Sequence, residues 1–208
     1  MSHHQSTQNI QSLLQSDPLF VFALEAEASD EFSGYDTVYI GVGKINATYH
    51  LTKAIIERKP SLIINLGSAG SNVHPRGSIV CCTRFVQRDM DVTALGFEKF
   101  QTPFVDGPAV LHYGLSVSDL AEGICGTGDC FVTEHTIDAY DVIDMEAFPI
   151  AWVAMHEKIP FLCLKYITDG ADGAAAVDWQ TSLHLAANAL KKVIVSLSES
   201  QAGSVFSG

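Results

Sequence analysis

Carboxylate side chains follow two apolar segments at the points where a strand would end. Glu25 and Glu27 come after the apolar run 18–24, and Asp169 comes after the run 160–168. Carboxylates that are crowded and partly buried raise one another's pKa, so one can be protonated while another is ionised near neutral pH. Cleavage of a glycosidic bond requires such an acid and base. Each of the three residues alone is weak evidence, because acidic loop residues are usually just solvated.

Two other segments carry residue types that suit a binding site. The apolar run 61–67 leads into the sequence GSAG at 67–70. Its glycines let the backbone approach a ligand and expose amides, although a tight turn explains the pattern equally well. The spacing is neither a GxGxxG fingerprint nor a Walker loop. Glu146 begins an apolar helical segment, where it either complements the helix dipole or accepts hydrogen bonds from ribose hydroxyls.

The elements that must position these residues alternate between strands and helices. Five mostly continuous apolar runs predict strands that are buried on both faces; they lie at 18–24, 36–43, 61–67, 78–86 and 160–168. Helical spacing of apolar residues predicts helices at 46–59 (with Asn46 as N-cap), 145–157 and 179–197. This alternation predicts an α/β fold with a mostly parallel or mixed central sheet. In such sheets ligands bind at the carboxyl ends of the strands, where the candidate residues stand.

Composition predicts one domain and limits its partners. A chain of 208 residues, 47% of them hydrophobic, can bury a large core, so we expect a single domain over 1–208 with flexible tails at 1–17 and 199–208. Twelve basic against 24 acidic residues leave a net charge of −12. This charge repels polyanions and argues against nucleic-acid binding. A small neutral or zwitterionic ligand suits it better.

The cysteines and the N-terminal segment indicate where the protein works. Five cysteines, an odd number without a CxxC pair or a zinc-type spacing, predict reduced buried thiols in a cytoplasmic protein. Residues 1–17 have no basic region followed by a long apolar stretch, so we expect neither a secretory signal nor a membrane anchor. We also expect no metal site and no organic cofactor.

Six segments, in order, resemble successive motifs of the nucleoside phosphorylase/hydrolase family: VGKINAT (42–48), INLGSAG (64–70), DMDVTALGF (89–97), GTGDCFV (126–132), DMEAFPIAWVA (144–154) and YITDGAD (166–172). The strongest similarity is to its 5′-methylthioadenosine/S-adenosylhomocysteine nucleosidase branch. The resemblance covers 20–197. It implies a three-layer nucleoside phosphorylase-like α/β fold, in which helices flank a mixed central sheet, and a homodimer that binds a small-molecule nucleoside.

The resemblance also implies a role for each candidate residue. Asp169 would be the general acid that protonates or hydrogen-bonds purine N7, and Glu27, rather than Glu25, would orient and deprotonate the attacking water. Glu146 would accept the ribose hydroxyls. The other substrate-binding residues that it implies are Met145 (sugar, through its backbone), Phe131 (stacking on adenine), Val132 (base edge, through its backbone), Ser68, Ala69 and Gly70 (sugar and water), Thr168 and Val42.

Missing arginines favour hydrolysis over phosphorolysis. Family phosphorylases resemble one another in placing an arginine two residues before the Gly-Ser of the central loop and another near the first strand. Here Asn65 holds the first position, and no arginine precedes Arg58, so a phosphate dianion would lack its charge partners. Two further departures are Lys165, where related nucleosidases usually carry arginine, and segments 97–126 and 131–144, which are shorter than in typical members.

Three functions remain open on this basis. We favour hydrolysis of 5′-methylthioadenosine and S-adenosylhomocysteine. A sister hydrolase that acts on another purine nucleoside, such as futalosine, is the alternative among enzymes. A nucleoside-binding protein without catalysis is the third, but a binder has no need for both an acid and a base, and Glu27, Glu146 and Asp169 are all present.

Overall fold

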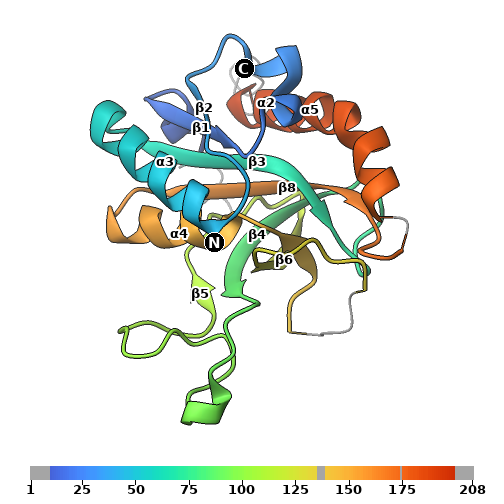
Figure 1. Cartoon of the computed structure of the whole chain (residues 1–208). Coiled ribbons are helices and arrows are strands. Elements are labelled where there is room, and N and C mark those ends of the chain that lie inside the picture. The colour runs from blue at the N-terminus through green and yellow to red at the C-terminus, as the bar shows by residue number, and fades with distance from the viewer. Residues whose placement is uncertain (1–9, 135–138, 174, 200–208) are drawn as a thin grey trace, which may run out of the picture.

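One eight-stranded sheet with helices on both faces forms the body of the chain (Figure 1). The computed structural model describes residues 10–134, 139–173 and 175–199. The strands are β1 Pro18–Phe22, β2 Thr37–Tyr39, β3 Leu62–Gly70, β4 Ile79–Gln87, β5 Leu111–His112, β6 Ala121–Thr127, β7 Val142–Asp144 and β8 Phe161–Asp169. The helices are α2 Glu25–Ala28, α3 Lys44–Arg58, α4 Ala147–His156 and α5 Ala175–Glu199, with 3-10 turns η1 Ser29–Phe32 and η2 Thr93–Leu95.

The pairing of the strands is mixed and gathers their ends at one place. β3 is parallel to both β1 and β8, whereas β4 is antiparallel to β8 and parallel to β6. β7 is parallel to β6 and returns to the end of β3, where Gly70 is opposite Ile143. Gly70 is also paired with Asp169 at the end of β8. The last residues of β3 and β8 therefore meet β7 at one edge of the sheet, as ligand sites of α/β sheets require.

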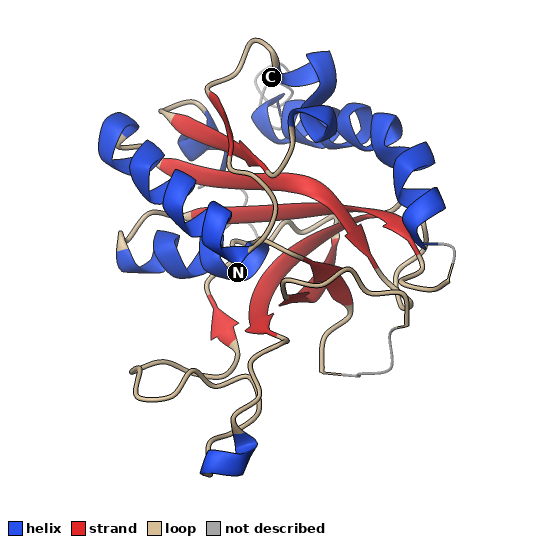
Figure 2. Cartoon of the chain, viewed as in Figure 1, coloured by secondary structure: helices blue, strands red, loops and turns tan. Residues whose placement is uncertain are grey.

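Two hydrophobic cores lie on opposite faces of the sheet. Because successive side chains of a strand point to opposite faces, Leu19 and Val21 of β1 pack with residues of α3 and α4. Phe20 and Phe22 pack with residues of α5 and η1 on the other face. Figure 2 shows the resulting order of helices, sheet and helices. The predicted three-layer α/β fold with a mixed central sheet is confirmed.

Four of the five predicted strands are present with ends that differ by at most three residues, but the run 36–43 forms a strand only at Thr37–Tyr39. Three strands were not predicted. β5, β6 and β7 are short or contain glycine. The predicted N-cap of α3 was wrong, because the helix begins at Lys44 with Gly43 as its N-cap. Gly43 has φ of 89°, which turns the chain into the helix. Asn46 lies within the first turn of α3, and its Nδ2 donates to the carbonyl oxygen of Val42 across 2.8 Å.

We expected the GSAG sequence at 67–70 to form a loop after a strand, but it is the last part of β3.

The N-terminal segment also differs from the expected tail where it is described. Residues 10–14 are helical, Ile10 is fully buried against the core beside α5, and Gln11 Nε2 donates to the carbonyl oxygen of Ser198 across 3.0 Å. The remaining tail residues, 1–9 and 200–208, lie outside the described part of the chain.

The described helices include none that is long and apolar enough to cross a lipid bilayer. The longest, α5, carries charged residues on one side and packs its apolar side on the sheet. Its amphipathic pattern explains this placement, since an apolar stripe on a surface helix faces the core.

Candidate active site

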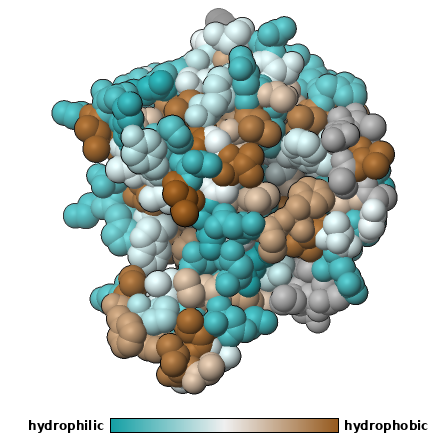
Figure 3. Space-filling model, in the orientation of Figure 1, coloured by the Kyte–Doolittle hydropathy of each residue, from teal (hydrophilic) through white to brown (hydrophobic). Residues whose placement is uncertain are grey.

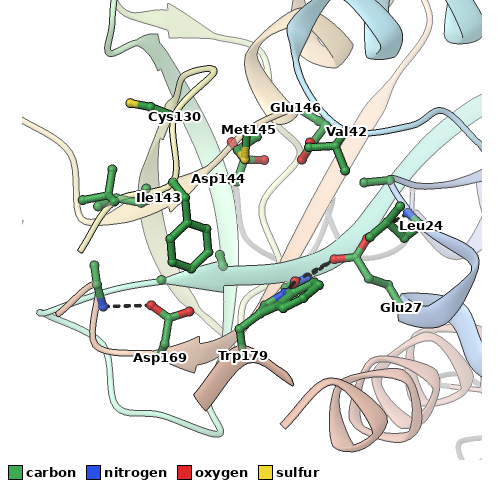
Figure 4. A pocket seen from close by; sticks show the side chains of 17 residues that line it. Leu24, Glu27, Val42, Cys130, Ile143, Asp144, Met145, Glu146, Asp169 and Trp179 are labelled. Carbon is green, nitrogen blue, oxygen red and sulfur yellow. Dashed lines mark hydrogen bonds between the residues drawn. The ribbon is translucent and has the colours of Figure 1, made fainter. Parts of the chain in front are cut away.

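A cavity of about 210 Å³ opens where β3, β7 and β8 end (Figure 4). All but one of the predicted site residues line it: Glu27, Val42, Ser68, Ala69, Gly70, Phe131, Val132, Met145, Glu146 and Asp169. The exception is Thr168, which is buried behind the cavity wall. The cavity thus brings together residues from both halves of the chain, because parallel strands end at the same edge of the sheet.

Glu27 is held by local and distant donors. It is the third residue of α2, and its Oε2 accepts a hydrogen bond from the backbone N–H of Leu24, the N-cap, across 3.2 Å. Its Oε1 accepts from the backbone N–H of Ser68 across 2.9 Å and from Ser68 Oγ across 2.6 Å. A Cβ added at Gly67 would lie 3.1 Å from Oε1. The glycine therefore makes room for this carboxylate, whereas the sequence suggested room for a ligand.

Asp169 ends β8 on another side of the same cavity. Its Oδ1 accepts from the backbone N–H of Ala171 across 2.9 Å, and its Oδ2 accepts from Thr168 Oγ1 across 2.9 Å. Thr168 therefore supports the aspartate from behind, in place of the substrate contact that we predicted. A Cβ at Gly70 would lie 2.7 Å from Asp169 Oδ1, so this position tolerates only glycine without a rearrangement.

Glu146 faces the cavity from the N-cap of α4. Its Oε1 accepts from the backbone N–H of Gly43 across 2.8 Å. Burial and then the nearby Asp144 carboxylate raise the pKa of Glu146 to about 7. Burial and like charge both oppose ionisation, so this residue changes protonation state near neutral pH.

A buried ion pair that sequence reasoning did not predict lies beside Glu146. Lys165 Nζ is 2.9 Å from Asp144 Oδ2, and the same oxygen accepts from the backbone N–H of Ala147 across 2.8 Å. Burial opposes ionisation of Asp144, but Lys165 and the Thr127 hydroxyl outweigh it and lower the Asp144 pKa. Burial likewise opposes the charge of Lys165, but Asp144 holds its pKa well above the usual value. The pair fixes the start of α4 and so the backbone of Glu146.

Seven further residues that were not predicted as site residues line the cavity beside the expected set: Ala23, Leu24, Cys130, Ile143, Asp144, Ala171 and Trp179. Trp179, near the start of α5, donates from its indole Nε1 to Ser68 Oγ across 2.8 Å. In Figure 4, Asp169 and Glu27 lie on either side of Trp179. Its position in a segment rich in alanine and polar residues gave no sequence signal beyond its being one of only two tryptophans.

The loop that carries Phe131 and Val132 is attached to the end of β4. Arg88 is almost fully buried and donates through its guanidinium to Cys130 Sγ and to the carbonyl oxygens of Gly128 and Cys130. The side chain of Phe131 is half exposed at the mouth of the cavity. This arrangement leaves its ring accessible to a flat ligand, since aromatic faces stack on other π systems.

No lysine, arginine or histidine is found among the described residues that line the cavity, whereas four carboxylates are. The buried Lys165 is already paired with Asp144, and the buried Arg88 already donates to Cys130 and Gly128. Asn65 does not reach the cavity, because its Nδ2 donates to the carbonyl oxygen of Val21 within the sheet. Glu25 is exposed and is not part of the lining. The cavity therefore suits an uncharged or cationic group.

Proteins of known sequence resemble the chain over most of its length. It is 31% identical to a 5′-methylthioadenosine/S-adenosylhomocysteine nucleosidase from Haemophilus influenzae, over 80% of this chain and 82% of the relative. It is 32% identical to the enzyme of the same name from Listeria monocytogenes, over 80% of this chain and 83% of the relative.

Solved structures share the fold. A nucleosidase mutant from Helicobacter pylori, with 5′-methylthioadenosine in its active site, superimposes with a TM-score of 0.80 at 18% identity, covering 89% of this chain and 99% of its own. A structure described as a futalosine hydrolase mutant from the same species superimposes equally well. The sequence profile of the phosphorylase superfamily matches residues 37–199. With this match and its relatives above 30% identity, the chain belongs to the phosphorylase superfamily.

Proposed function

We propose that this protein is a purine-nucleoside N-glycosidase that cleaves the bond between adenine and ribose with water, acting on 5′-methylthioadenosine and S-adenosylhomocysteine. The observation that supports it most is the convergence of Glu27, Glu146 and Asp169 on one cavity. The sequence relatives, which bear the name of this activity, support the choice of substrate.

The three carboxylates fit the charges that develop when the bond from C1′ of the sugar to N9 of the base breaks. Positive charge grows on the sugar, which becomes an oxocarbenium ion, and the bonding electrons move onto the base. Asp169 donates a proton or hydrogen bond to purine N7 and so stabilises the leaving base. Glu27 accepts a proton from the water that attacks C1′, and Glu146 accepts hydrogen bonds from the ribose hydroxyls. Glu27, together with Glu146 when it is ionised, stabilises the positive sugar of the transition state more than the neutral substrate.

Water, rather than phosphate, is the nucleophile that the lining favours. A phosphate dianion in a partly desolvated cleft needs cationic partners, and none of the described lining residues is a lysine, arginine or histidine. A water molecule needs only a carboxylate such as Glu27 and the backbone around Ser68. Asn65 does not bear on the choice of nucleophile, because its side chain lies within the sheet and donates to the carbonyl oxygen of Val21.

The test is base release from a panel of nucleosides with and without inorganic phosphate. We expect adenine and free 5-methylthioribose from 5′-methylthioadenosine, at the same rate in both buffers. Futalosine and inosine test the alternative that the protein is a hydrolase of another purine nucleoside. Faster base release from futalosine would make futalosine the substrate. Formation of a sugar 1-phosphate would make the enzyme a phosphorylase. Binding of every nucleoside without release would leave only the binding function.

A homodimer is the assembly we propose, and an apolar stripe on α3 supports it. Ile45, Tyr49 and Ile56 are exposed on one face of this helix. Single exposed apolar residues are common, but apolar residues that gather on one face suit a contact with another protein surface. The β4–β5 connection also projects from the body (Figures 1 and 3), and its Phe104 is exposed. Sedimentation should give a dimer that Tyr49→Glu converts to a monomer. A cytoplasmic location and independence from cofactors remain part of the same proposal.

A further inference from the structure

A chain of two hydrogen bonds joins α5 to the carboxylate of Glu27. The indole Nε1 of Trp179 donates to Ser68 Oγ across 2.8 Å, and Ser68 Oγ donates to Glu27 Oε1 across 2.6 Å. The first bond spans the sheet edge between residues 111 positions apart in sequence. All three residues line the cavity, and Figure 4 shows the chain of bonds leading from Trp179 to Glu27.

The chemistry of the donors gives this chain a direction. An indole N–H can only donate, whereas a hydroxyl has one proton to give and two lone pairs that accept. Because Trp179 fills one lone pair of Ser68 Oγ, the hydroxyl is oriented with its proton toward Glu27. Without the indole, the same hydroxyl could rotate its proton away from the carboxylate toward other acceptors or water.

The two oxygens of Glu27 are consequently unequal. Oε1 accepts from both the hydroxyl and the backbone N–H of Ser68. Among the described residues, Oε2 accepts only from the backbone N–H of Leu24, across the longer distance of 3.2 Å. An ionised carboxylate oxygen accommodates about two donors. Oε1 is therefore fully occupied, and Oε2 retains the open position for a further donor.

We propose that Trp179 is a positioning residue for hydrolysis, which holds the Ser68 hydroxyl on Glu27 Oε1 and thereby reserves Glu27 Oε2 for the attacking water. The proposal rests on the proposed function, since it assumes that Glu27 takes the proton of this water. Trp179 acts through Ser68. It touches neither the proton that moves nor the bond that breaks.

Removal of the indole N–H with retention of an aromatic ring is the first test. In Trp179→Phe we expect kcat to fall roughly 10-fold, as for loss of one hydrogen bond that orients a catalytic group. Trp152→Phe is the matched control, because Trp152 stacks on Phe148 in α4 and is absent from the cavity lining. Its kcat should stay within about twofold of the parent value.

A double-mutant cycle separates positioning from a general loss of packing. If Trp179 acts through Ser68, then Trp179→Phe should have little further effect on kcat in a Ser68→Ala background, because the two changes remove the same chain of bonds. Additive effects on kcat would overturn the proposal. So would a Trp179→Phe variant that folds and retains the parent kcat, or one that changes only KM.

The third measurement requires no turnover. The protein has two tryptophans, so a 15N-edited NMR spectrum contains two indole N–H signals. Each signal is assigned by its loss in one of the two variants, Trp152→Phe or Trp179→Phe. Glu27→Gln and Ser68→Ala should each move the Trp179 signal and leave the Trp152 signal in place. An unmoved Trp179 signal in both variants would refute the chain of bonds. Failure of the parent enzyme to release any base, with these shifts intact, would refute the proposed function instead.

Discussion

Lys165 Nζ lies 2.9 Å from Asp144 Oδ2, and the two side chains are 3% and 1% exposed. Removal of one partner of a buried ion pair leaves the other charge without compensation, at a cost of about 3–5 kcal/mol. We therefore expect Lys165→Met to lower the free energy of unfolding by about this amount, measured by denaturant titration. Lys53→Met, at an exposed lysine, is the control and should change it by less than about 0.5 kcal/mol.

The same pair predicts a rescue. In the double variant Asp144→Asn with Lys165→Met, no charge remains buried without its partner, so part of the lost stability should return. The asparagine can still accept from the backbone N–H of Ala147, which Asp144 now caps. A double variant less stable than Lys165→Met alone would show that the lysine side chain stabilises the sheet through packing rather than through its charge.

The raised pKa of Glu146 predicts a dependence of stability on pH. Its pKa is about 7 in the folded protein, against an ordinary value of 4.5 for a glutamate side chain. Between these values the folded state holds a proton that the unfolded state has released, so the contribution of Glu146 to stability falls as pH rises from 4.5 to about 7 and does not change further above that. The shift corresponds to about 3 kcal/mol.

Comparison of the parent with Glu146→Gln tests this dependence. Thermal unfolding of both proteins between pH 5 and pH 8 should show the variant gaining stability relative to the parent as pH rises. Because the amide does not ionise, the variant lacks this source of pH dependence. Parallel curves for the two proteins would mean that the Glu146 pKa is the same in the folded and unfolded states.

Replacement of the proposed acid should abolish turnover without unfolding the protein. In Asp169→Asn the amide cannot deliver a proton to the base, so kcat should fall by on the order of 100-fold or more. The amide oxygen can still accept from the Ala171 N–H, and circular dichroism should be unchanged. Asp172→Asn is the control, since Asp172 forms an exposed ion pair with Arg76. A near-parental rate in Asp169→Asn would remove it from the mechanism.

The two glutamates of α2 provide a matched pair. Glu27 is buried with three hydrogen bonds to its carboxylate, whereas Glu25 is exposed. Glu27→Gln should lower kcat by on the order of 100-fold, and Glu25→Gln should be nearly silent. Steady-state rates of adenine release decide between them. The reverse order would show that the general base is Glu25 and that our assignment of this role to Glu27 is wrong.

The sequence was sufficient to predict elements with a strong local signal. A nearly continuous apolar run, interrupted only by Lys165 and Thr168, predicts β8, and helical spacing predicts α3 within two residues of its start. β7 could not be predicted, because three residues carry too little periodicity. Residues distant in sequence set the start of α3. Asp129 accepts from the backbone N–H of Lys44, and Glu146 accepts from the backbone N–H of Gly43.

For the site, the resemblance identified the residues that line the cavity but not the hydrogen-bond and ion-pair partners that hold them. Glu27 and Asp169 were candidates because each follows an apolar run, and the structure places both at one cavity. The glycines at 67 and 70 were interpreted as room for a ligand, whereas they face these carboxylates. Trp179 and the Asp144–Lys165 pair were missed, because side chains that meet across the sheet leave no pattern in local sequence.

The pairing of β3 with β8 also has a consequence for how the chain is made. Ile63 of β3 pairs with Phe161 of β8, almost a hundred residues later in the chain. At a synthesis rate of about 5 to 20 residues per second, β3 leaves the ribosome on the order of 10 s before its partner. During that interval an apolar strand has an unpaired edge, a known template for aggregation. We expect nascent chains that end before residue 160 to engage chaperones and those that include α5 to be released.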